Sequence, residues 1–194
     1  MIRLYDDLIE WIDLMSTIGG EAMLTNDLIT ERLILKSTRE EYASLCLDIW
    51  LDDETGKYLG DPPREKVTEQ YMNFAKGIES DETWYPFVAF LKGTNELVGT
   101  GSIVWMDDKG HLDLGYCVHK KYWRQGYGTE IVQALIDFGY SKGGRKFTAD
   151  IAQENVASNA LIKKLGFTIE KEGFFTKKGT TITYKDYTYQ LNLE

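Results

Sequence analysis

The residues with the clearest potential for chemistry form a short glycine-containing segment, residues 122–130 (YWRQGYGTE). It lies between a predicted strand and the start of a predicted helix. Glycine lets backbone amides approach an anion closely, and the first N–H groups of a helix lack internal partners and carry the positive end of its dipole. The segment therefore predicts a site where main-chain N–H groups hold a diphosphate.

Two better-known phosphate motifs do not fit this segment. The dinucleotide-binding fingerprint requires a third glycine where Ile131 stands, and the P-loop requires a Gly-Lys-Ser/Thr ending that is absent. What remains is a Gly-x-Gly loop, which by itself equally suits tight packing between a strand and a helix. Whether the loop binds an anion or only packs a strand against a helix therefore depends on the sequence around it.

The formal net charge of the 194-residue chain is −9, and it is unevenly distributed. Residues 1–61 contain 14 acidic and 5 basic residues, whereas residues 119–146 contain 6 basic and 2 acidic ones. This argues against general binding of nucleic-acid phosphates, which needs a basic surface. The pattern favours an anionic ligand near the basic segment and a cationic one near the acidic part, although charged runs are more often solvated faces.

The composition indicates an ordinary globular protein of one domain, with 43% apolar and 27% charged residues. No apolar run reaches the roughly 18 residues that a membrane-spanning helix needs, and acidic residues interrupt the first 18 residues, unlike a targeting signal. Cys46 and Cys117 are the only cysteines, and their spacing predicts neither a disulfide nor a metal site. We therefore expect a cytoplasmic protein without a metal and without membrane contact.

Hydrophobic periodicity predicts the elements. An amphipathic helical extension is expected over residues 1–24, where it is also a candidate dimer contact, and one domain is expected over residues 25–194. Further helices are expected after a capping box formed by Thr38 and Glu41, over residues 67–78, along the stripe of Ile131, Leu135 and Phe138, and along Ala157, Leu161 and Leu165 with Gly166 as C-terminal cap. Strands are expected over residues 30–36, 85–91, 96–106, 111–119, 146–152, 167–176 and 181–193.

The order of these elements predicts the fold class. Three consecutive strands joined by short turns suggest an antiparallel meander, and strands alternate with helices after it. We expect an α/β (α+β) protein with a mixed, mostly antiparallel central sheet and helices on both faces.

At this point the chain resembles the GNAT superfamily of acetyl-CoA-dependent N-acetyltransferases, and more narrowly its ribosomal-protein-alanine acetyltransferase branch, called RimJ/RimL-like. Gly126 and Gly128 match the family loop Q/R-x-x-G-x-G/A, while Trp123 stands at the Q/R position, as is typical of the branch. Other parts of the branch pattern recur as residues 115–116 (GY), residues 129–130 (TE), residues 155–159 (NVASN), residues 165–167 (LGF), residues 30–35 (TERLIL) and Asp186. The sequence departs from the branch at Lys120, Arg124, Gln125 and Gly128.

The resemblance implies how acetyl-CoA is bound. Residues 125–129, namely Gln125, Gly126, Tyr127, Gly128 and Thr129, would offer main-chain N–H groups to the diphosphate, with the charge of Arg124 nearby. The backbone of Cys117 and Val118 would pair with the amide groups of pantetheine, as an added strand pairs with a sheet edge. Asn155 and Asn159 of the second signature would bind the pantetheine arm or order that wall, although an asparagine at Asn155 is equally suited to capping a helix.

The resemblance also points to residues that move protons. Attack on a thioester needs a neutral amine, and Asp113, which stands where the family often has a glutamate on its central strand, is the candidate base; a plain surface aspartate is the competing interpretation. The family tyrosine that protonates the thiolate corresponds here to Ile162. Ser158, a tyrosine elsewhere such as Tyr184, or water would then replace it, and we expect direct transfer rather than a Cys117 nucleophile.

The acceptor follows less directly from the sequence. The resemblance favours the α-amine of a protein N-terminus, whereas the acidic residues 1–61 also suit a polyamine or an aminoglycoside. A protein acceptor predicts an open groove, and a small polycation predicts a pocket lined by several carboxylates. A module that binds acyl-CoA without catalysis is the alternative from a different class.

Overall fold

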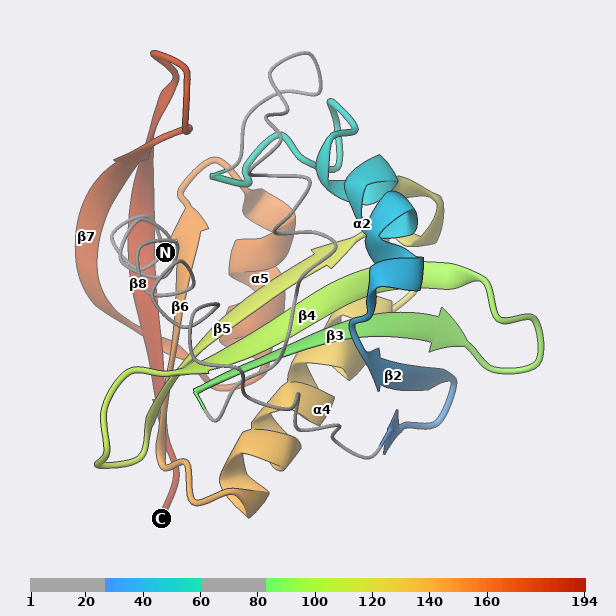
Figure 1. The fold of residues 1–194 in the computed structure, drawn as a ribbon. Coiled ribbons are helices and arrows are strands. Elements are labelled where there is room, and N and C mark those ends of the chain that lie inside the picture. The colour runs from blue at the N-terminus through green and yellow to red at the C-terminus, as the bar shows by residue number, and fades with distance from the viewer. Residues whose placement is uncertain (1–26, 61–82) are drawn as a thin grey trace, which may run out of the picture.

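A computed structural model of the protein describes residues 27–60 and 83–194. Within them lies one eight-stranded sheet with the strand order β1-β2-β3-β4-β5-β6-β8-β7 (Figure 1). The strands are β1 (Leu28–Ile29), β2 (Leu33–Ser37), β3 (Trp84–Leu91), β4 (Leu97–Trp105), β5 (His111–Val118), β6 (Lys146–Ala152), β7 (Thr168–Thr176) and β8 (Thr183–Asn192). Each predicted strand is present, and β1 is an addition that the sequence did not predict.

The pairing within the sheet confirms the predicted fold class. Strands β3, β4 and β5 form the expected antiparallel meander. Strands β5 and β6 are parallel, and every other neighbouring pair is antiparallel. A parallel pair needs a long crossover connection, and here the helix between β5 and β6 supplies it.

The helices in the described residues are α2 (Ala43–Trp50), α4 (Tyr127–Ser141) and α5 (Val156–Lys164), with short 3-10 turns η1 (Glu40–Tyr42) and η3 (Lys120–Tyr122). The predicted end of the last helix is confirmed, because Gly166 has a φ of 89° and its N–H donates to the carbonyl of Lys163. No helix of the described residues is both long enough and apolar enough to cross a membrane.

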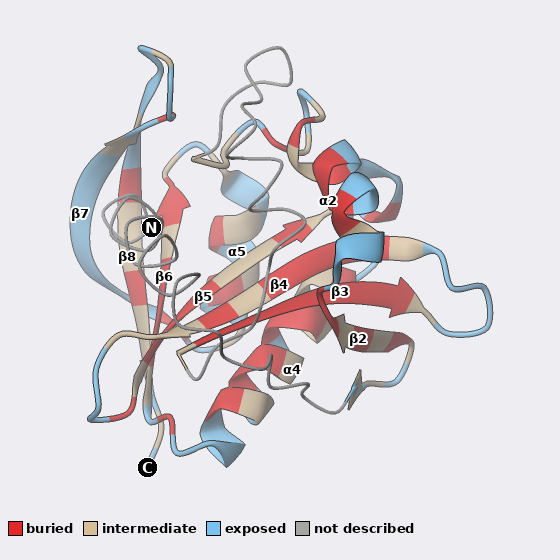
Figure 2. Ribbon diagram, in the orientation of Figure 1, coloured by how far each residue is buried: buried red, intermediate tan, exposed pale blue. Residues whose placement is uncertain are grey.

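The side chains of the sheet divide into two faces. On one face Phe87, Leu112 and Phe147 pack with Ile131 and Leu135 of α4 in the main core. On the other face Val88 and Phe90 of β3 pack with Cys46 of α2. Helices therefore cover both faces, as predicted, and the buried residues concentrate in the central strands (Figure 2).

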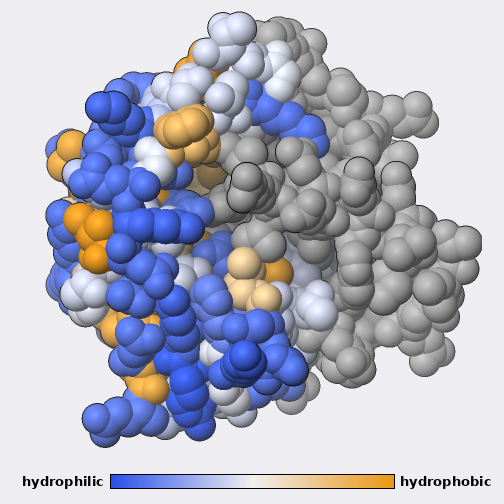
Figure 3. Space-filling view, turned by 90° about the vertical axis from the view of Figure 1, so that its left-hand side faces the viewer, coloured by the Kyte–Doolittle hydropathy of each residue, from blue (hydrophilic) through white to orange (hydrophobic). Residues whose placement is uncertain are grey.

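The outer strand β7 is exposed along nearly its whole length. The surface at this side of the molecule is mostly hydrophilic, with scattered hydrophobic patches (Figure 3). Ile169 and Phe174 of β7 are exposed hydrophobic residues. Glu170, Lys171 and Glu172 lie within this strand. Charged residues on an exposed edge oppose uncontrolled strand pairing.

The predicted capping box is wrong. The residue before η1 is Arg39, and no side chain caps either η1 or α2. The N–H of Thr38 instead donates to the carbonyl of Pro86 at 3.0 Å, so Thr38 continues the pairing of β2 with β3 and the helical turn starts after it. The helices predicted over residues 1–24 and 67–78 lie outside the described residues.

Candidate active site

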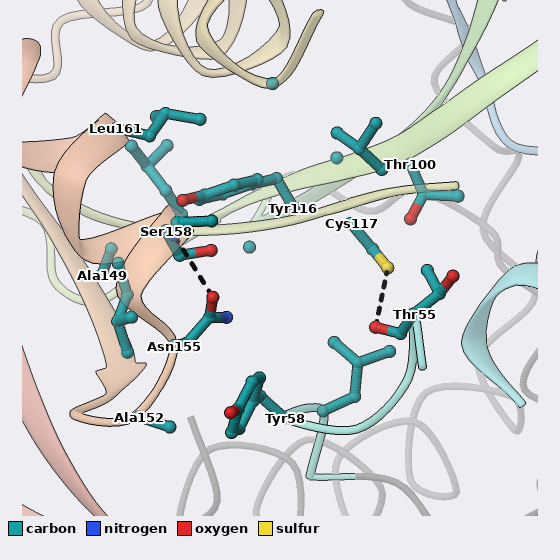
Figure 4. A pocket seen from close by; sticks show the side chains of 18 of the residues that line it. Thr55, Tyr58, Thr100, Tyr116, Cys117, Ala149, Ala152, Asn155, Ser158 and Leu161 are labelled. Carbon is teal, nitrogen blue, oxygen red and sulfur yellow. Dashed lines mark hydrogen bonds between the residues drawn. The ribbon is translucent and has the colours of Figure 1, made fainter. Parts of the chain in front are cut away.

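The centre of the site is a gap in the sheet between β5 and β6. The pairing of these strands ends at Asp113 and Thr148, and beyond this point the two strands diverge. A cavity of about 1190 Å³ is lined by residues 114–118 of β5 and residues 149–152 of β6 (Figure 4). The two strands therefore leave a cleft between them toward their ends at Val118 and Ala152.

The predicted diphosphate loop lies at one end of this cavity. Gly126 is the N-cap of α4 and has a φ of 84°, a left-handed conformation that glycine adopts without steric cost. The N–H groups of Tyr127, Gly128 and Thr129, which begin this helix, have no carbonyl one turn earlier in the helix to bind, and the three residues line the cavity. Trp123 fastens the loop to β5, because its indole Nε1 donates to the carbonyl of Val118 at 2.7 Å.

The loop is also held from the start of β2. Arg32 donates from Nη1 to the carbonyl of Gln125 at 2.8 Å, and its guanidinium lies 4.2 Å from the ring centre of Tyr127. The same guanidinium forms an ion pair with Glu130 at 2.7 Å, and Glu130 additionally accepts from the hydroxyl of Thr30. The segment 30–35, which the resemblance singled out, thus orients the loop without lining the cavity.

A third wall comes from the start of α5. The side chain of Asn155 accepts a hydrogen bond from the N–H of Ser158 at 3.2 Å, which makes Asn155 the N-cap, and both residues line the cavity. Asn159 is buried; it donates to the carbonyl of Ala152 and accepts from the hydroxyl of Tyr189 at 2.7 Å. Asn155 is thus both a cap and a wall residue, whereas Asn159 supports the wall from behind.

The predicted base, Asp113, lies deeper than the cavity wall. It is buried where β5 and β6 still pair, and its carboxylate accepts from the hydroxyl of Thr148 at 2.7 Å. That hydroxyl also lies 3.1 Å from Nε2 of His111, so a hydrogen-bonded chain runs from Asp113 to His111. Burial raises the pKa of Asp113 to about 6, and the bond from Thr148 opposes the rise.

Two aspartates that the sequence analysis did not assign to the site line the cavity. Asp150 of β6 and Asp186 of β8 lie on the same face of the sheet as Asp113, and Asp150 accepts from the hydroxyl of Thr188. Burial raises the pKa of Asp186, and the nearby charge of Asp150 raises it further. Alternation along the predicted strand 146–152 would have placed Asp150 opposite the core residue Phe147, which is a usable signal.

The segment from Leu51 to Gly60, which we call the crossing loop, joins the walls of the cavity. On the β5 side its Thr55 carbonyl lies 3.9 Å from Sγ of Cys117, and Asp52 pairs with Lys120 at 2.9 Å. On the other side the hydroxyl of Tyr58 donates to the carbonyl of Glu154. The sequence did not predict the role of this loop, because its contacts join segments far apart in the chain.

Most of the predicted cofactor residues meet at the cavity. Those that line it are Cys117, Val118, Arg124, Gly126, Tyr127, Gly128, Thr129 and Asn155, together with the predicted proton donor Ser158. Gln125, Asn159 and Asp113 do not line it. The amide of Gln125 turns away, donating to the carbonyl of Lys121 at 3.1 Å.

The arrangement suits a long ligand with an anionic end. Free amides at the start of α4 and the charge of Arg124 would suit a diphosphate, and the gap between β5 and β6 would suit an extended chain with peptide-like groups. The hydroxyl of Tyr116 is buried in this gap without a hydrogen-bond partner among the described residues. A buried polar atom of this kind fits a ligand that supplies the missing partner.

Comparisons with known proteins agree with this geometry. A family model described as acetyltransferase (GNAT) domain matches residues 32–168. The uncharacterized N-acetyltransferase p20 of Bacillus licheniformis is 30% identical over 150 residues, which cover 75% of this chain and 83% of that protein.

Solved structures are similar at lower identity. RimL, a ribosomal L7/L12 alpha-N-protein acetyltransferase, has a TM-score of 0.72 at 18% identity, with 91% of this chain and 99% of that chain covered. Spermidine N-acetyltransferase from Vibrio cholerae, in complex with CoA and spermine, has a TM-score of 0.71 at 15% identity, with 84% and 96% covered. At these identities the likeness shows the fold.

Proposed function

The chain belongs to the GNAT acetyltransferase family and is an acetyl-CoA-dependent N-acetyltransferase, and from that premise we propose that its acceptor is a small amine with more than one positive charge. The observation that supports this acceptor is the pair of carboxylates, Asp150 and Asp186, on the wall of the cavity. Glu154 lines the same cavity. Polyamines and aminoglycosides are amines of this class, and several carboxylates in one pocket suit them by charge.

A protein N-terminal amine is the second candidate acceptor. The motif that favours it is the RimJ/RimL-like pattern around Trp123, together with residues 30–35. Such an acceptor brings one ammonium group and an extended backbone, so it needs a groove that admits a chain end more than it needs several carboxylates.

We further propose that the amine attacks the thioester directly, with both substrates bound. The loop before α4 and the gap between β5 and β6 suit acetyl-CoA. Asp150 and Asp186 suit an amine that enters the cavity on the face of the sheet that α2 covers. Cys117 lines the cavity, but its thiol lies against the carbonyl of Thr55 in the crossing loop. Direct attack of the amine on the thioester needs no covalent intermediate on Cys117.

Asp113 and Asp150 are the two candidates for accepting the proton of the amine. The raised pKa of Asp113 suits a base that works near neutral pH, and its hydrogen-bonded chain to His111 offers a path for the proton. Asp150 lines the cavity directly, whereas Asp113 requires a bridging water. A base is expected to control the acidic side of the pH profile of kcat.

The acceptor is tested by incubating the protein with acetyl-CoA and spermidine, an aminoglycoside or peptides with a free N-terminal amine, while free thiol is followed. We expect the polycations to stimulate release of CoA. We expect Asp186→Asn to raise the acceptor KM by about 10-fold, the usual loss for one charged contact, without changing the Kd of acetyl-CoA. Stimulation by peptides alone would select the second candidate.

The same assay separates the two candidate bases. The two variants are Asp113→Asn and Asp150→Asn. The variant that lacks the true base should have a kcat lower by at least about 100-fold and should lose the acidic limb of the pH profile of kcat. Replacement of the other aspartate should leave the limb in place. Retention of the limb in both variants would exclude both residues.

A further inference from the structure

The side chain of Tyr116 extends across the cleft. It starts on β5, and its ring crosses toward the start of α5, with the hydroxyl directed at Ser158 (Figure 4). The hydroxyl is buried and has no hydrogen-bond partner among the described residues. Leaving a buried hydroxyl unpaired costs stability, so such a group in a binding cavity points to a partner that arrives with the ligand.

The surroundings of this hydroxyl keep it protonated. Burial raises the pKa of Tyr116 to about 12, and the neighbouring Ser158 acts against this rise. Ala149 and Leu161, which line the cavity beside it, are apolar. Tyr116 therefore presents an O–H donor at any pH at which the protein works, and in an apolar site such a donor interacts strongly with a developing negative charge.

Neither the residue at the family's tyrosine position nor Tyr184 reaches the cavity. Ile162, which stands where the family has its tyrosine, is completely buried and packs in the main core. Tyr184 packs edge-on against Tyr58 and is not among the residues that line the cavity. Of the groups on this wall, the hydroxyls of Tyr116 and Ser158 remain.

We propose that the hydroxyl of Tyr116 donates a hydrogen bond to the sulfur of CoA as this sulfur becomes a thiolate. In the transfer, the amine nitrogen bonds to the thioester carbon, the carbon–sulfur bond breaks and the electron pair stays on sulfur. The proton lost by the amine goes to the base or to water. Tyr116 keeps its own proton and stabilises the leaving group, so its contribution does not depend on which amine is the acceptor.

The direct test measures the pKa of the CoA thiol in the complex. Thiolate absorbance of bound CoA is titrated for the wild type and for Tyr116→Phe, and the complex with desulfo-CoA, which lacks the thiol, is subtracted to remove the signals of Cys46 and Cys117. A lost hydrogen bond to a charged sulfur should raise the pKa of bound CoA by about one unit in Tyr116→Phe. Ser158→Ala is the matched control and should shift it less.

Equal thiol pKa values in wild type and Tyr116→Phe, at equal Kd of CoA, would overturn the proposal. A shift in Ser158→Ala as large as that in Tyr116→Phe would overturn the assignment to Tyr116. If Tyr116→Phe does not fold, 3-fluorotyrosine incorporated at position 116 replaces it. Because this phenol is a stronger donor, it should lower the pKa of bound CoA, and a rise would contradict the proposal.

Kinetics supply a second readout. With an acceptor that the wild type uses, Tyr116→Phe should lower kcat by about 10- to 100-fold and leave the Kd of acetyl-CoA unchanged within a factor of three. The shape of the pH profile should stay the same, since Tyr116 does not titrate in the working range. A wild type that turns over no polycation would refute the proposed acceptor alone, and the thiol titration would still decide the role of Tyr116.

Discussion

Arg124 has a backbone conformation that the side chain makes costly. Its φ is 59°, and it and Asn95 are the non-glycine residues with positive φ in the described part of the chain. A residue with a Cβ loses roughly 1 kcal/mol there relative to glycine. The sequence departs from the RimJ/RimL-like branch at this position, and the chain accepts the cost at a residue that lines the cavity.

Two variants separate the conformational cost from the charge. Arg124→Gly should be more stable than Arg124→Ala by about 1 kcal/mol, because only glycine relieves the strain. Both should weaken acetyl-CoA binding equally, by about 3- to 10-fold, because both lose the cation. Thermal unfolding and calorimetric titration measure the two effects. Equal unfolding temperatures for the two variants would contradict the strain.

The buried carboxyl of Asp113 makes stability depend on pH. Its pKa is about 6 in the folded protein and about 3.9 in an unfolded chain, so the folded state binds the proton more tightly. The ionised form therefore destabilises the fold above pH 6, and this penalty disappears as the pH falls toward 4. Asp113→Asn should accordingly be more stable than wild type by about 2 kcal/mol at pH 8, with no advantage at pH 4.

Urea unfolding at both pH values measures this difference. Asp108→Asn, in an exposed turn, is the control and should leave stability unchanged at both. An advantage of Asp113→Asn that is the same at pH 8 and pH 4 would mean that it does not arise from the ionisation of Asp113.

At the level of single residues, the sequence predicted the kind of site better than it predicted which side chains line the cavity and which are buried behind it. The glycine spacing located a loop that does lie at the cavity end, because a backbone site depends on local conformation. Alternation along a strand predicts the face of Asp113 but not that the neighbouring strand still covers it there. The inward orientation of Asn159 depends on the hydroxyl of Tyr189, which is 30 residues away in the chain.

At the level of elements, the contact between the start of β2 and the loop before α4 depends on the planar guanidinium of Arg32, which donates hydrogen bonds from more than one nitrogen. Arg32 binds the carbonyl of Gln125 and the carboxylate of Glu130 at the same time. Arg32→Ala should release the loop and raise the Kd of acetyl-CoA by about 10-fold. Arg32→Lys should restore little of this loss, because lysine is a single point donor.

Calorimetric titration with acetyl-CoA measures the effect of both substitutions. Arg39→Ala, which removes an exposed cation beyond the opposite end of β2, is the control and should bind normally. Full recovery in Arg32→Lys would show that charge alone acts at this position.

The bounds of the strands were predictable and the buried sides of the helices were less so. Strand β6 has the predicted range, because its alternation and flanking glycines are local signals. In α5 the buried residues are Asn159 and Ile162, whereas the predicted stripe contained Ala157, which is exposed. The glycine at position 128, where the sequence departs from the RimJ/RimL-like branch, is explained by a contact with another element. A Cβ at this position would lie 2.8 Å from Cδ1 of Leu161, so α5 occupies the space.

At the level of the whole molecule, the crossing loop connects the first helix of the described chain with its last hairpin. Lys177, between β7 and β8, is buried and donates from Nζ to the carbonyl of Gly56 at 2.8 Å. Lys177→Met should destabilise the fold by about 1 to 3 kcal/mol, because the carbonyl loses a charged donor. It should raise the acceptor KM while the Kd of acetyl-CoA stays within about twofold, because the loop before α4 is held separately.

Steady-state kinetics and urea unfolding test this expectation. Lys109→Met, in the exposed turn that follows β4, is the control and should behave as wild type. An equal rise in the Kd of acetyl-CoA would mean that the crossing loop orders the whole cavity rather than the acceptor side.

The early end of the pairing between β5 and β6 links the lifetime of this protein to metabolism. The pairing of these two central strands ends at Asp113 and Thr148, and an acetyl donor bound in the gap, as proposed above, would pair with the backbone beyond this point. Since the donor binds the folded chain, saturation at 100 times its Kd adds about 2.7 kcal/mol to the free energy of unfolding. When acetyl-CoA is scarce, more of the population opens and becomes accessible to proteases. The nutritional state of the cell would then set how much enzyme persists, in addition to how fast it works.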